Sequence, residues 1–430
     1  MSTHRKSTTR RKFLAGAATA ALGAAITAPM AMADSEPSDP AQLPDPQGSG
    51  IDHIIVVMME NRSFDHYLGW LPGAEGKQDG LTFTDRYGVP HSTHHLQGDA
   101  QGCSFNDPDH SFEGGRIAYN NGACDGWLRA GTNDAFAIGY YQQADLGFYG
   151  QAAPYWTTCD RYFSAIMAET YPNRFYQHAA RTDRIHNSTV ISTLPTIWDR
   201  LASAGLKGRY YFYDTPFTAL WGTKYQSISR PFSEFLADCA SGNLPQVSFV
   251  DPKFLDEGSG TSADDHPHAD IRAGQAFLNQ VYQAVTSSPA WGRIMLVINY
   301  DEWGGFFDHV PPQVAPDANP DWGLRGFRVP CLVISPRARR NYVAHNVYDH
   351  ASVLKAIEWR WNVPALTPRD AAARNLAEVL DFVNPPNLSA PRWSVPSAVG
   401  LPCGLTAPDY EQWRALHSLA ISVGFNLTAS

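Results

Sequence analysis

Apolar runs of strand length recur along the chain. Residues 54–59 and 293–300 are nearly unbroken apolar segments, which is typical of strands buried on both faces of a parallel sheet. Shorter runs predict further strands at 209–213, 246–250 and 329–335. Helical spacing of apolar residues predicts helices at 195–205, 271–286 and 351–361. The pattern favours an α/β domain with a mostly parallel central sheet.

Polar side chains stand where three of these strands end. Glu60 and Asn61 follow the first long run, Asp301 and Glu302 follow the second, and Asp251 follows a shorter strand. In open α/β sheets ligands bind at the carboxyl ends of the strands. Each pair alone could be a cap or a turn. Two buried strands that both deliver oxygen ligands instead predict a site for one divalent cation.

Thr170 precedes a predicted helix that has Pro172 in its first turn. A hydroxyl at a helix N-terminus meets unpaired N–H groups and the positive end of the dipole, which favour its deprotonation and a bound phosphoryl group. An ordinary N-cap is the more common role of such a threonine. The position therefore indicates a nucleophile only in combination with the strand ends.

A polar cluster at 264–270 contains His266 and His268 and precedes the predicted helix at 271–286, which suits metal or phosphate binding. The segment 72–155 has few periodic apolar runs and reads as an insertion over the strand ends. It carries His110 and many aromatic residues. These aromatic residues could pack the insertion on the core or form an apolar wall for a substrate.

The N-terminus has the features of an export signal. Arg10-Arg11 and the Ala31-Met32-Ala33 site predict a twin-arginine signal peptide over 1–33, followed by a linker at 34–50. Removal of 1–33, which carries five basic and no acidic residues, lowers the net charge from −9 to −14. An acidic protein without a visible polybasic patch is a poor candidate for nucleic-acid binding. We therefore expect a secreted or cell-envelope protein, with the twin-arginine machinery as its export partner.

The chain has six cysteines, at 103, 124, 159, 239, 331 and 403. Export permits disulfides, and Cys103 with Cys124 could close a loop within the insertion. Cys331 lies in an apolar run and could equally be a buried thiol. The pairing stays open.

Four motifs in this order resemble the bacterial and plant phosphoesterases, the family that groups non-specific phospholipases C with a bacterial acid phosphatase. They are MMENRSFDHYLG, ETYPNRFY, the long run from DDHPHADIRAGQAFLNQ to INYDEWGGFFDHVPP, and DHASVLKAIEWRW. The resemblance covers most of 51–383. It implies an alkaline-phosphatase-like three-layer α/β sandwich whose loop-rich insertion lies over the active site. The tail from 384 to 430 is expected to pack on the same domain.

The resemblance also assigns roles to residues. Glu60, Asn61, Asp301 and Glu302 match metal ligands, and Thr170 matches the nucleophile. His266 and His110 match histidines beside the scissile phosphate. Weaker candidates for phosphate binding are Asn61, His268, Asp251 and His309. Trp303 departs from the His or Asn expected there, which bears on the mouth of the pocket. His350 is expected to be structural.

The sequence therefore predicts a metal-dependent phosphoric ester hydrolase of the phospholipase C type that works through a phospho-threonine. The alternatives are an acid phosphatase for small monoesters and a non-catalytic metal- or phosphate-binding protein. The cofactor is one or more divalent ions that prefer oxygen ligands, with Ca²⁺, Mn²⁺, Mg²⁺ and Fe²⁺ left open. The expected partners are a phospholipid or a small phosphoester, with transient contact to a membrane surface.

Overall fold

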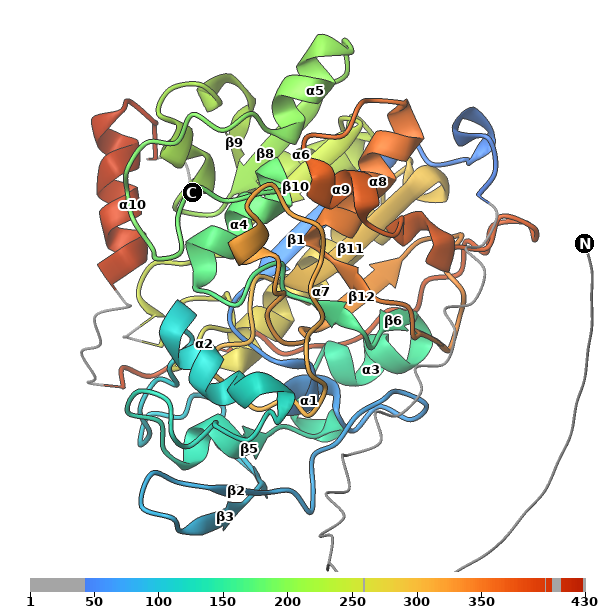
Figure 1. The fold of residues 1–430 in the computed structure, drawn as a ribbon. Coiled ribbons are helices and arrows are strands. Elements are labelled where there is room, and N and C mark those ends of the chain that lie inside the picture. The colour runs from blue at the N-terminus through green and yellow to red at the C-terminus, as the bar shows by residue number, and fades with distance from the viewer. Residues whose placement is uncertain (1–42, 258–259, 399, 404–410, 428–430) are drawn as a thin grey trace, which may run out of the picture. The chain divides into compact units, whose positions relative to one another are not determined.

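The computed structural model describes residues 43–427 apart from 258–259, 399 and 404–410. The predicted signal peptide and most of the predicted linker lie outside these residues. Among the described residues, eight strands form one central sheet (Figure 1). Their order is β13 (Tyr342–Ala344), β6 (Thr157–Cys159), β12 (Cys331–Ile334), β11 (Ile294–Tyr300), β1 (His53–Met59), β10 (Val247–Val250), β8 (Gly208–Phe212) and β9 (Ser229–Pro231).

Most of the sheet is parallel, as the apolar runs predict. Strands β11, β1, β10, β8 and β9 pair in parallel, whereas β12 runs antiparallel to β11 and β6 runs antiparallel to β12. Consecutive residues of β1, β10 and β11 are buried, so both faces of the sheet are covered. This confirms the predicted α/β fold with a mostly parallel sheet.

Helices of very different length cover the sheet and its edges. The predicted helix at 271–286 has the same bounds in the structure, and the helix expected after Thr170 begins at that residue. The helices are α1 (Phe64–Leu68), α2 (Phe112–Tyr119), α3 (Tyr149–Tyr155), α4 (Thr170–Ala179), α5 (Ile197–Ser203), α6 (Phe232–Ser241), α7 (Ile271–Thr286), α8 (His350–Trp361), α9 (Pro368–Ala372) and α10 (Glu411–Ser422). None of the described helices is long and apolar enough to span a bilayer.

The segment 72–155 contains short elements joined by loops, which Figure 1 draws in blue to teal below the central sheet. Its strands are β2 (Thr82–Thr84) with β3 (Pro90–Ser92), and β5 (Gly139–Tyr140) with β4 (His94–His95). A further pair outside it joins β14 (Tyr348–Asp349) to β7 (Tyr162–Phe163). The aromatic side chains Trp127, Phe136, Phe148 and Tyr149 are fully buried. They pack the insertion against the core, which favours the packing interpretation over an apolar substrate wall.

The disulfide differs from the pairing considered above. Cys103 bonds to Cys403, while Cys124 is a buried free thiol. Cys124 lies in a separate apolar cluster with Trp127 and Phe327, so it belongs to the packing of the insertion. A partner 300 residues away cannot be found from local spacing. The bond ties the insertion to the C-terminal segment.

Candidate active site

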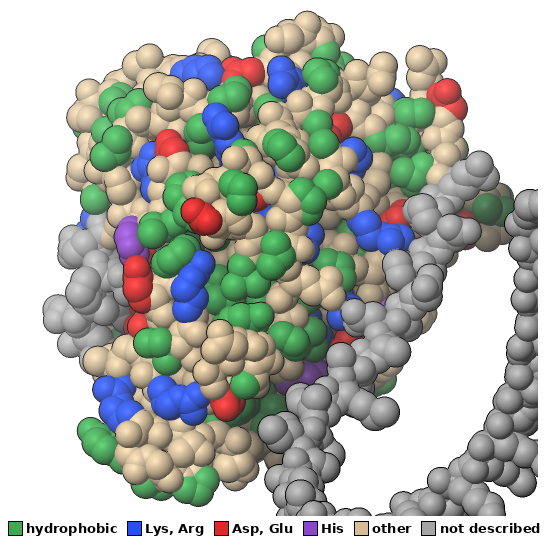
Figure 2. Space-filling view, in the orientation of Figure 1, with side chains coloured by type: hydrophobic (Ala, Val, Ile, Leu, Met, Phe, Trp, Pro, Cys, Tyr) green, Lys and Arg blue, Asp and Glu red, His purple; other side chains and the backbone are tan. Residues whose placement is uncertain are grey.

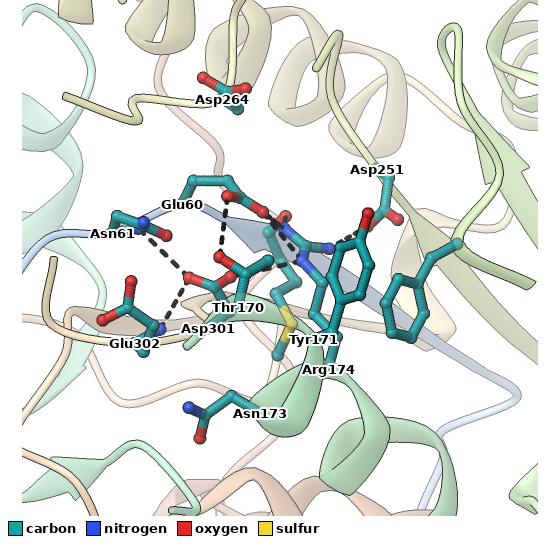
Figure 3. Close-up of polar contacts among 12 residues, drawn as sticks. Glu60, Asn61, Thr170, Tyr171, Asn173, Arg174, Asp251, Asp264, Asp301 and Glu302 are labelled. Carbon is teal, nitrogen blue, oxygen red and sulfur yellow. Dashed lines mark hydrogen bonds and ion pairs between the residues drawn. The ribbon is translucent and has the colours of Figure 1, made fainter. Parts of the chain in front are cut away.

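Three neighbouring parallel strands deliver carboxylates to the same edge of the sheet. Met59 of β1 lies beside Tyr300 of β11, and Val57 lies beside Val250 of β10. The next residues of the three strands therefore emerge together, and Glu60, Asp301 and Asp251 are all buried there (Figure 3). Asn61 N donates to Asp301 Oδ1 at 3.2 Å, which closes the edge between the two central strands.

Asn61 turns sharply after β1. Its φ of 57° lies in the left-handed region, which asparagine tolerates better than most residues. The turn points its amide nitrogen at the insertion, where it lies 3.4 Å from His110 Nε2. Glu302 also belongs to this edge, because its N donates to Asp301 Oδ1 and its Oε2 accepts from Gly304 N, both at 2.7 Å.

Thr170 is the first residue of α4, and its hydroxyl lies 3.5 Å from Glu60 Oε2. The approach to the helix is held by the side chain of Asn173. Its amide nitrogen donates to the carbonyls of Ile166 and Ala168 at 3.1 and 2.8 Å, and its Oδ1 accepts from Ile166 N. The PNR motif thus fixes the loop that presents the threonine hydroxyl to the strand ends.

Arg174 is a site residue that the strand-end reasoning did not identify. One turn after Thr170, its guanidinium contacts Glu60 Oε1 at 2.6 Å, Asp251 Oδ1 at 3.1 Å and Asp301 Oδ2 at 3.4 Å (Figure 3). It also donates to the carbonyl of Met58. A single buried arginine therefore bridges the ends of all three strands. The signal in the sequence was its place in the motif, four residues after Thr170 on the same helix face.

The loop that carries His266 is tied directly to the end of β1. Glu60 N donates to the carbonyl of Asp264 at 2.8 Å, and Arg62 Nε donates to the carbonyl of Asp265 at 2.6 Å. Asp265 in turn accepts from the Tyr300 hydroxyl at 2.6 Å. These contacts hold Asp264 and Asp265, and with them the start of the His266 loop, against the end of β1.

The two candidate histidines lie beside each other. The ring centroids of His110 and His266 are 5.7 Å apart in an edge-to-face arrangement, and both side chains are buried. Burial lowers the pKa of His266 well below its usual value, and the neighbouring His110 lowers it further. His266 is therefore held in its neutral form, which can accept a proton or bind a metal.

Buried carboxylates outnumber the cations that pair with them. Six carboxylates at or beside the strand ends are at most 4% exposed, namely Glu60, Asp251, Glu257, Asp264, Asp301 and Glu302. Among the described lysines and arginines, only Arg174 forms ion pairs with any of them, and it pairs with three. Burial raises the pKa of every one of these carboxyl groups, and it raises that of Asp264 to about 7. Buried charge of one sign is costly unless a counter-ion or a proton neutralises it.

The residues present fit a divalent cation. Within the described part of the chain, Asn61 Oδ1, Asp301 Oδ2 and Glu302 Oε1 are buried and accept no hydrogen bond. Such oxygens are the ligands that hard divalent ions prefer. Acidic and histidine groups able to hold a metal are thus present. The three ligand atoms that lie close together come from Glu60, Glu257 and His266, however, and this group does not include Asp301 or Glu302.

The weaker candidates for phosphate binding differ in whether they contact the residues at the strand ends. Asp251 is part of the Arg174 network and also accepts from the Tyr210 hydroxyl. His268 contacts the Phe105 carbonyl at 3.1 Å and stacks on Phe136. His309 belongs to a separate cluster with Asp65, Asp308 and Arg328. The structure thus groups only Asp251 of these three with the strand ends.

Two residues near the acidic pair are structural. His350 Nε2 lies 2.7 Å from the Asp301 carbonyl and its Nδ1 lies 3.1 Å from the Tyr162 hydroxyl, so it supports the strand end from below. Trp303 is fully buried in the apolar cluster of the insertion and packs against Phe327. Its departure from the expected His or Asn therefore affects packing, and it does not shape an open pocket mouth.

Comparisons with known proteins identify the family of the chain. The model of the phosphoesterase family matches residues 51–364. Phospholipase C B of Mycobacterium tuberculosis is 32% identical over 433 residues, covering 82% of each chain, and non-specific phospholipase C1 of Arabidopsis thaliana is 30% identical, covering 79% of this chain and 73% of its own. A solved alkaline phosphatase superfamily protein from Vibrio parahaemolyticus is 10% identical, with a TM-score of 0.34 over 76% of this chain and 70% of its own, too distant to support any further argument. The family match and the two sequence relatives place the chain in the phosphoesterase family, as a phosphoester hydrolase.

Proposed function

We propose that this hydrolase is an exported, metal-dependent phospholipase C that cleaves a phospholipid into diacylglycerol and a phosphorylated head group. The observation that carries the proposal is the Thr170 hydroxyl, which stands at the N-terminus of α4, 3.5 Å from Glu60 Oε2, at strand ends where Asp301 Oδ2 and Glu302 Oε1 accept no hydrogen bond from the described residues. Two relatives with about 30% identity bear the name phospholipase C, which favours this substrate class over a small monoester.

Glu60, Asn61, Asp301 and Glu302 would hold the cation, as the sequence predicted. A divalent ion there supplies Lewis-acid chemistry, lowering the pKa of the hydroxyl and drawing charge from a phosphoryl oxygen. Thr170 Oγ attacks phosphorus, the bond to the diacylglycerol oxygen breaks, and the phosphorylated head group remains on Thr170. Backbone N–H groups of the first turn of α4 and the helix dipole stabilise the negative charge that develops.

A histidine completes the reaction by moving protons. His110 or His266 takes the proton of the Thr170 hydroxyl as its oxygen attacks and passes that proton to the leaving oxygen of diacylglycerol. The same histidine then takes a proton from the water that hydrolyses the phospho-threonine and returns it to Thr170 Oγ. The two rings are neighbours, with His110 next to Asn61 and His266 within the group of ligand atoms that includes Glu60, so both lie beside the strand ends. Thr170 is fully buried, so the substrate must displace surrounding side chains to reach it.

The molecular surface is compatible with transient contact with lipid. Exposed apolar side chains include Tyr87, Val190 and Val314, which are 84%, 70% and 71% exposed. On the face in Figure 2, basic and acidic side chains are interspersed with apolar ones, and no continuous basic surface is visible among the described residues. Apolar insertion, more than attraction to anionic lipid, would then bring the protein to a membrane.

The deciding experiment compares phosphatidylcholine with p-nitrophenyl phosphate on the wild-type protein and on Thr170→Ala and Thr170→Ser. Release of phosphocholine without monoester turnover is the expected result. Thr170→Ala should lose at least about a thousandfold in kcat, as other nucleophile deletions do, while Thr170→Ser retains part of it. Circular dichroism of both variants serves as the folding control.

Each alternative has its own outcome in the same experiment. Monoester turnover without phosphocholine release would identify an acid phosphatase. Near-normal activity of Thr170→Ala would remove threonine as the nucleophile. A protein that binds phosphate without turning over either substrate, and that traps no phosphorus on Thr170 after an acid quench, would be a binding protein.

A further inference from the structure

A second group of metal-binding side chains lies beside the predicted cation ligands. Glu60, Glu257 and His266 each offer one ligand atom, and these three atoms lie within 4.8 Å of one another. All three side chains are at most 2% exposed. Glu257 was not among the residues expected at the site, because it lies in a loop with no strand or motif to mark it.

The carboxyl group of Glu257 has no cationic partner among the described residues, and its side-chain neighbour is a second acid, Asp264. Neither of its oxygens accepts a hydrogen bond from the described residues, and the same holds for Asp264 Oδ2 next to it. No described lysine or arginine forms an ion pair with Glu257 or Asp264. Leaving such groups unsatisfied costs roughly 1–3 kcal/mol each, and more when they are charged.

A second cluster in the same molecule shows how such a charge is otherwise neutralised. Asp65, Asp308 and His309 also place three ligand atoms within 4.8 Å. There Arg328 contacts Asp65 at 3.0 Å and Asp308 at 2.8 Å, and His309 lies against Asp65. In that cluster the positive charge of Arg328 neutralises the carboxylates, so no metal ion is needed there. Arg174 forms ion pairs with Glu60, Asp251 and Asp301, but it forms none with Glu257.

We infer that Glu257, His266 and Glu60 form a second divalent-cation site, distinct from the one proposed at Asn61, Asp301 and Glu302. The two carboxylate oxygens of Glu60 have different partners. Its Oε1 accepts two hydrogen bonds from Arg174, at 2.9 and 2.6 Å, which leaves Oε2 for a cation. Asp264, whose side chain neighbours Glu257, has a buried Oδ2 without a hydrogen-bond partner among the described residues, so it could supply a further oxygen.

The donor set selects the chemical class of the ion. An imidazole nitrogen with two or three carboxylate oxygens suits Zn²⁺, Mn²⁺ or Fe²⁺, whereas Ca²⁺ and Mg²⁺ prefer oxygen alone. Because Glu60 Oε2 also accepts from the Thr170 hydroxyl, the second ion sits next to the nucleophile, as in sites where two metals clamp one phosphoryl group. His266 is then a ligand, and His110 is left as the histidine that moves protons.

The test counts ions per chain. Full-length protein, stripped with a chelator and dialysed against MnCl₂ or ZnCl₂, is analysed for bound metal by mass spectrometry. We expect two ions in the wild type and one in Glu257→Gln or His266→Gln, with at least about tenfold weaker binding of the lost ion. His309→Gln is the matched control from the arginine-neutralised cluster, and it should keep both ions.

A spectroscopic readout separates a ligand from a merely nearby histidine. In the Co²⁺-loaded protein, an imidazole N–H resonance shifted by the paramagnetic ion should be present in the wild type and in His110→Gln, and absent in His266→Gln. A wild type that binds one ion, kept in Glu257→Gln and lost in Asp301→Asn, overturns the inference. So does a shifted resonance that persists in His266→Gln.

The inference rests on the proposed function only for the first ion, at Asn61, Asp301 and Glu302. Failure of the second site can therefore be told apart from failure of the proposed function. A one-ion enzyme that still forms phospho-threonine would keep the phospholipase C proposal and reject the second site. If Glu257→Gln does not fold by circular dichroism, the wild-type ion count and the His266→Gln spectrum still decide.

Discussion

At the residue scale, Arg174 supplies the positive charge that partly neutralises the buried carboxylates at the strand ends. Its guanidinium forms ion pairs with Glu60, Asp251 and Asp301 in a fully buried position. Phe254 and Trp413 lie under it, with ring centroids 4.7 and 5.3 Å away. A planar, always charged fork can satisfy several carboxylates at once, which a compact ammonium group cannot. We therefore regard Arg174 as a positioning residue that orients Glu60 and Asp301.

Two substitutions at this position should differ in a characteristic way. Arg174→Lys keeps the charge but loses the fork, so we expect a fall in kcat of about tenfold to a hundredfold and weaker metal binding. Arg174→Gln leaves buried carboxylates uncompensated, and we expect it to lower the unfolding free energy by about 3–5 kcal/mol. The measurements are phosphocholine release with added metal and urea unfolding.

Arg337 supplies the control for this pair, because it is a half-buried arginine on a loop away from the site. Arg337→Lys should leave kcat and metal affinity unchanged. If Arg174→Lys retained wild-type kcat at every metal concentration, the orientation of Glu60 and Asp301 would not depend on the guanidinium.

At the scale of elements, the sequence was informative wherever the signal is local. The apolar runs locate β1 and β11, their parallel pairing brings Glu60 and Asp301 to one edge, and the PNR motif marks the start of α4 at Thr170. Contacts between distant segments carry no local signal. For this reason the sequence did not reveal that Arg174 joins three strands, or that Glu257 faces Glu60.

Helix α10 shows the same limit from the C-terminal end. For the tail from 384 to 430 we expected only that it packs on the same domain, and no signal marked Trp413 in advance. In the structure Trp413 stacks on Phe254 with centroids 3.6 Å apart, and the Tyr171 hydroxyl donates to the carbonyl of Gln412. Tyr171 is the neighbour of the proposed nucleophile. The helix thus packs against the side of the active site that holds Arg174.

Trp413→Ala should therefore damage both stability and activity. Loss of a fully buried tryptophan costs about 3–5 kcal/mol of unfolding free energy, and removal of the ring that faces Arg174 should lower kcat in addition. Trp413→Phe should recover most of the activity. Leu416→Ala is the control, because Leu416 lies on the same helix and is equally buried but has no ring. We expect it to lose a similar amount of stability with little change in the kcat of the folded fraction. An equal loss of kcat in both variants would argue against a specific role of Trp413.

Helix α8 carries a buried acid that makes stability depend on pH. Burial, together with the neighbouring Asp370, raises the pKa of Glu358 to about 9. Between its ordinary pKa near 4.5 and about 9, the folded protein keeps this proton while the unfolded chain has lost it. This group's contribution to stability therefore falls as pH rises through that window, by at most about 1.4 kcal/mol per pH unit.

Glu358→Gln replaces the titrating carboxyl group with an amide, so this contribution to the pH dependence of stability is lost. We expect its Tm to exceed the wild-type value at pH 8 and the difference to vanish or reverse near pH 4.5, as measured by calorimetry. Glu234→Gln, an exposed acid on α6, should give the same Tm difference at both pH values. A pH-independent effect of Glu358→Gln would mean that the side chain is ionised in the folded protein.

At the scale of the whole molecule, the active site is assembled from segments that meet only in three dimensions. The insertion contributes His110, the sheet contributes the carboxylates, and α10 backs Arg174. The Cys103–Cys403 disulfide joins two of these parts near the loop of His266 and His268. Gln101, two residues before Cys103, donates to the carbonyls of both His268 and Leu401 at 3.2 and 2.8 Å. The bond thus fastens the insertion, the histidine loop and the C-terminal segment at one point.

Breaking this bond should weaken the protein as a whole and loosen the histidine loop in particular. The disulfide closes a loop of 300 residues, and loss of such a cross-link costs about 2–5 kcal/mol of unfolding free energy. We expect the Cys103→Ser/Cys403→Ser variant to unfold at lower urea concentration and to exchange the amide protons of 264–268 faster. Reductant should destabilise the wild type to the same extent and leave the double variant unchanged, because Cys124, Cys159, Cys239 and Cys331 are free thiols in both. A wild type whose unfolding is insensitive to full reduction of this bond would show that hydrogen bonds such as those of Gln101 hold the three segments together without it.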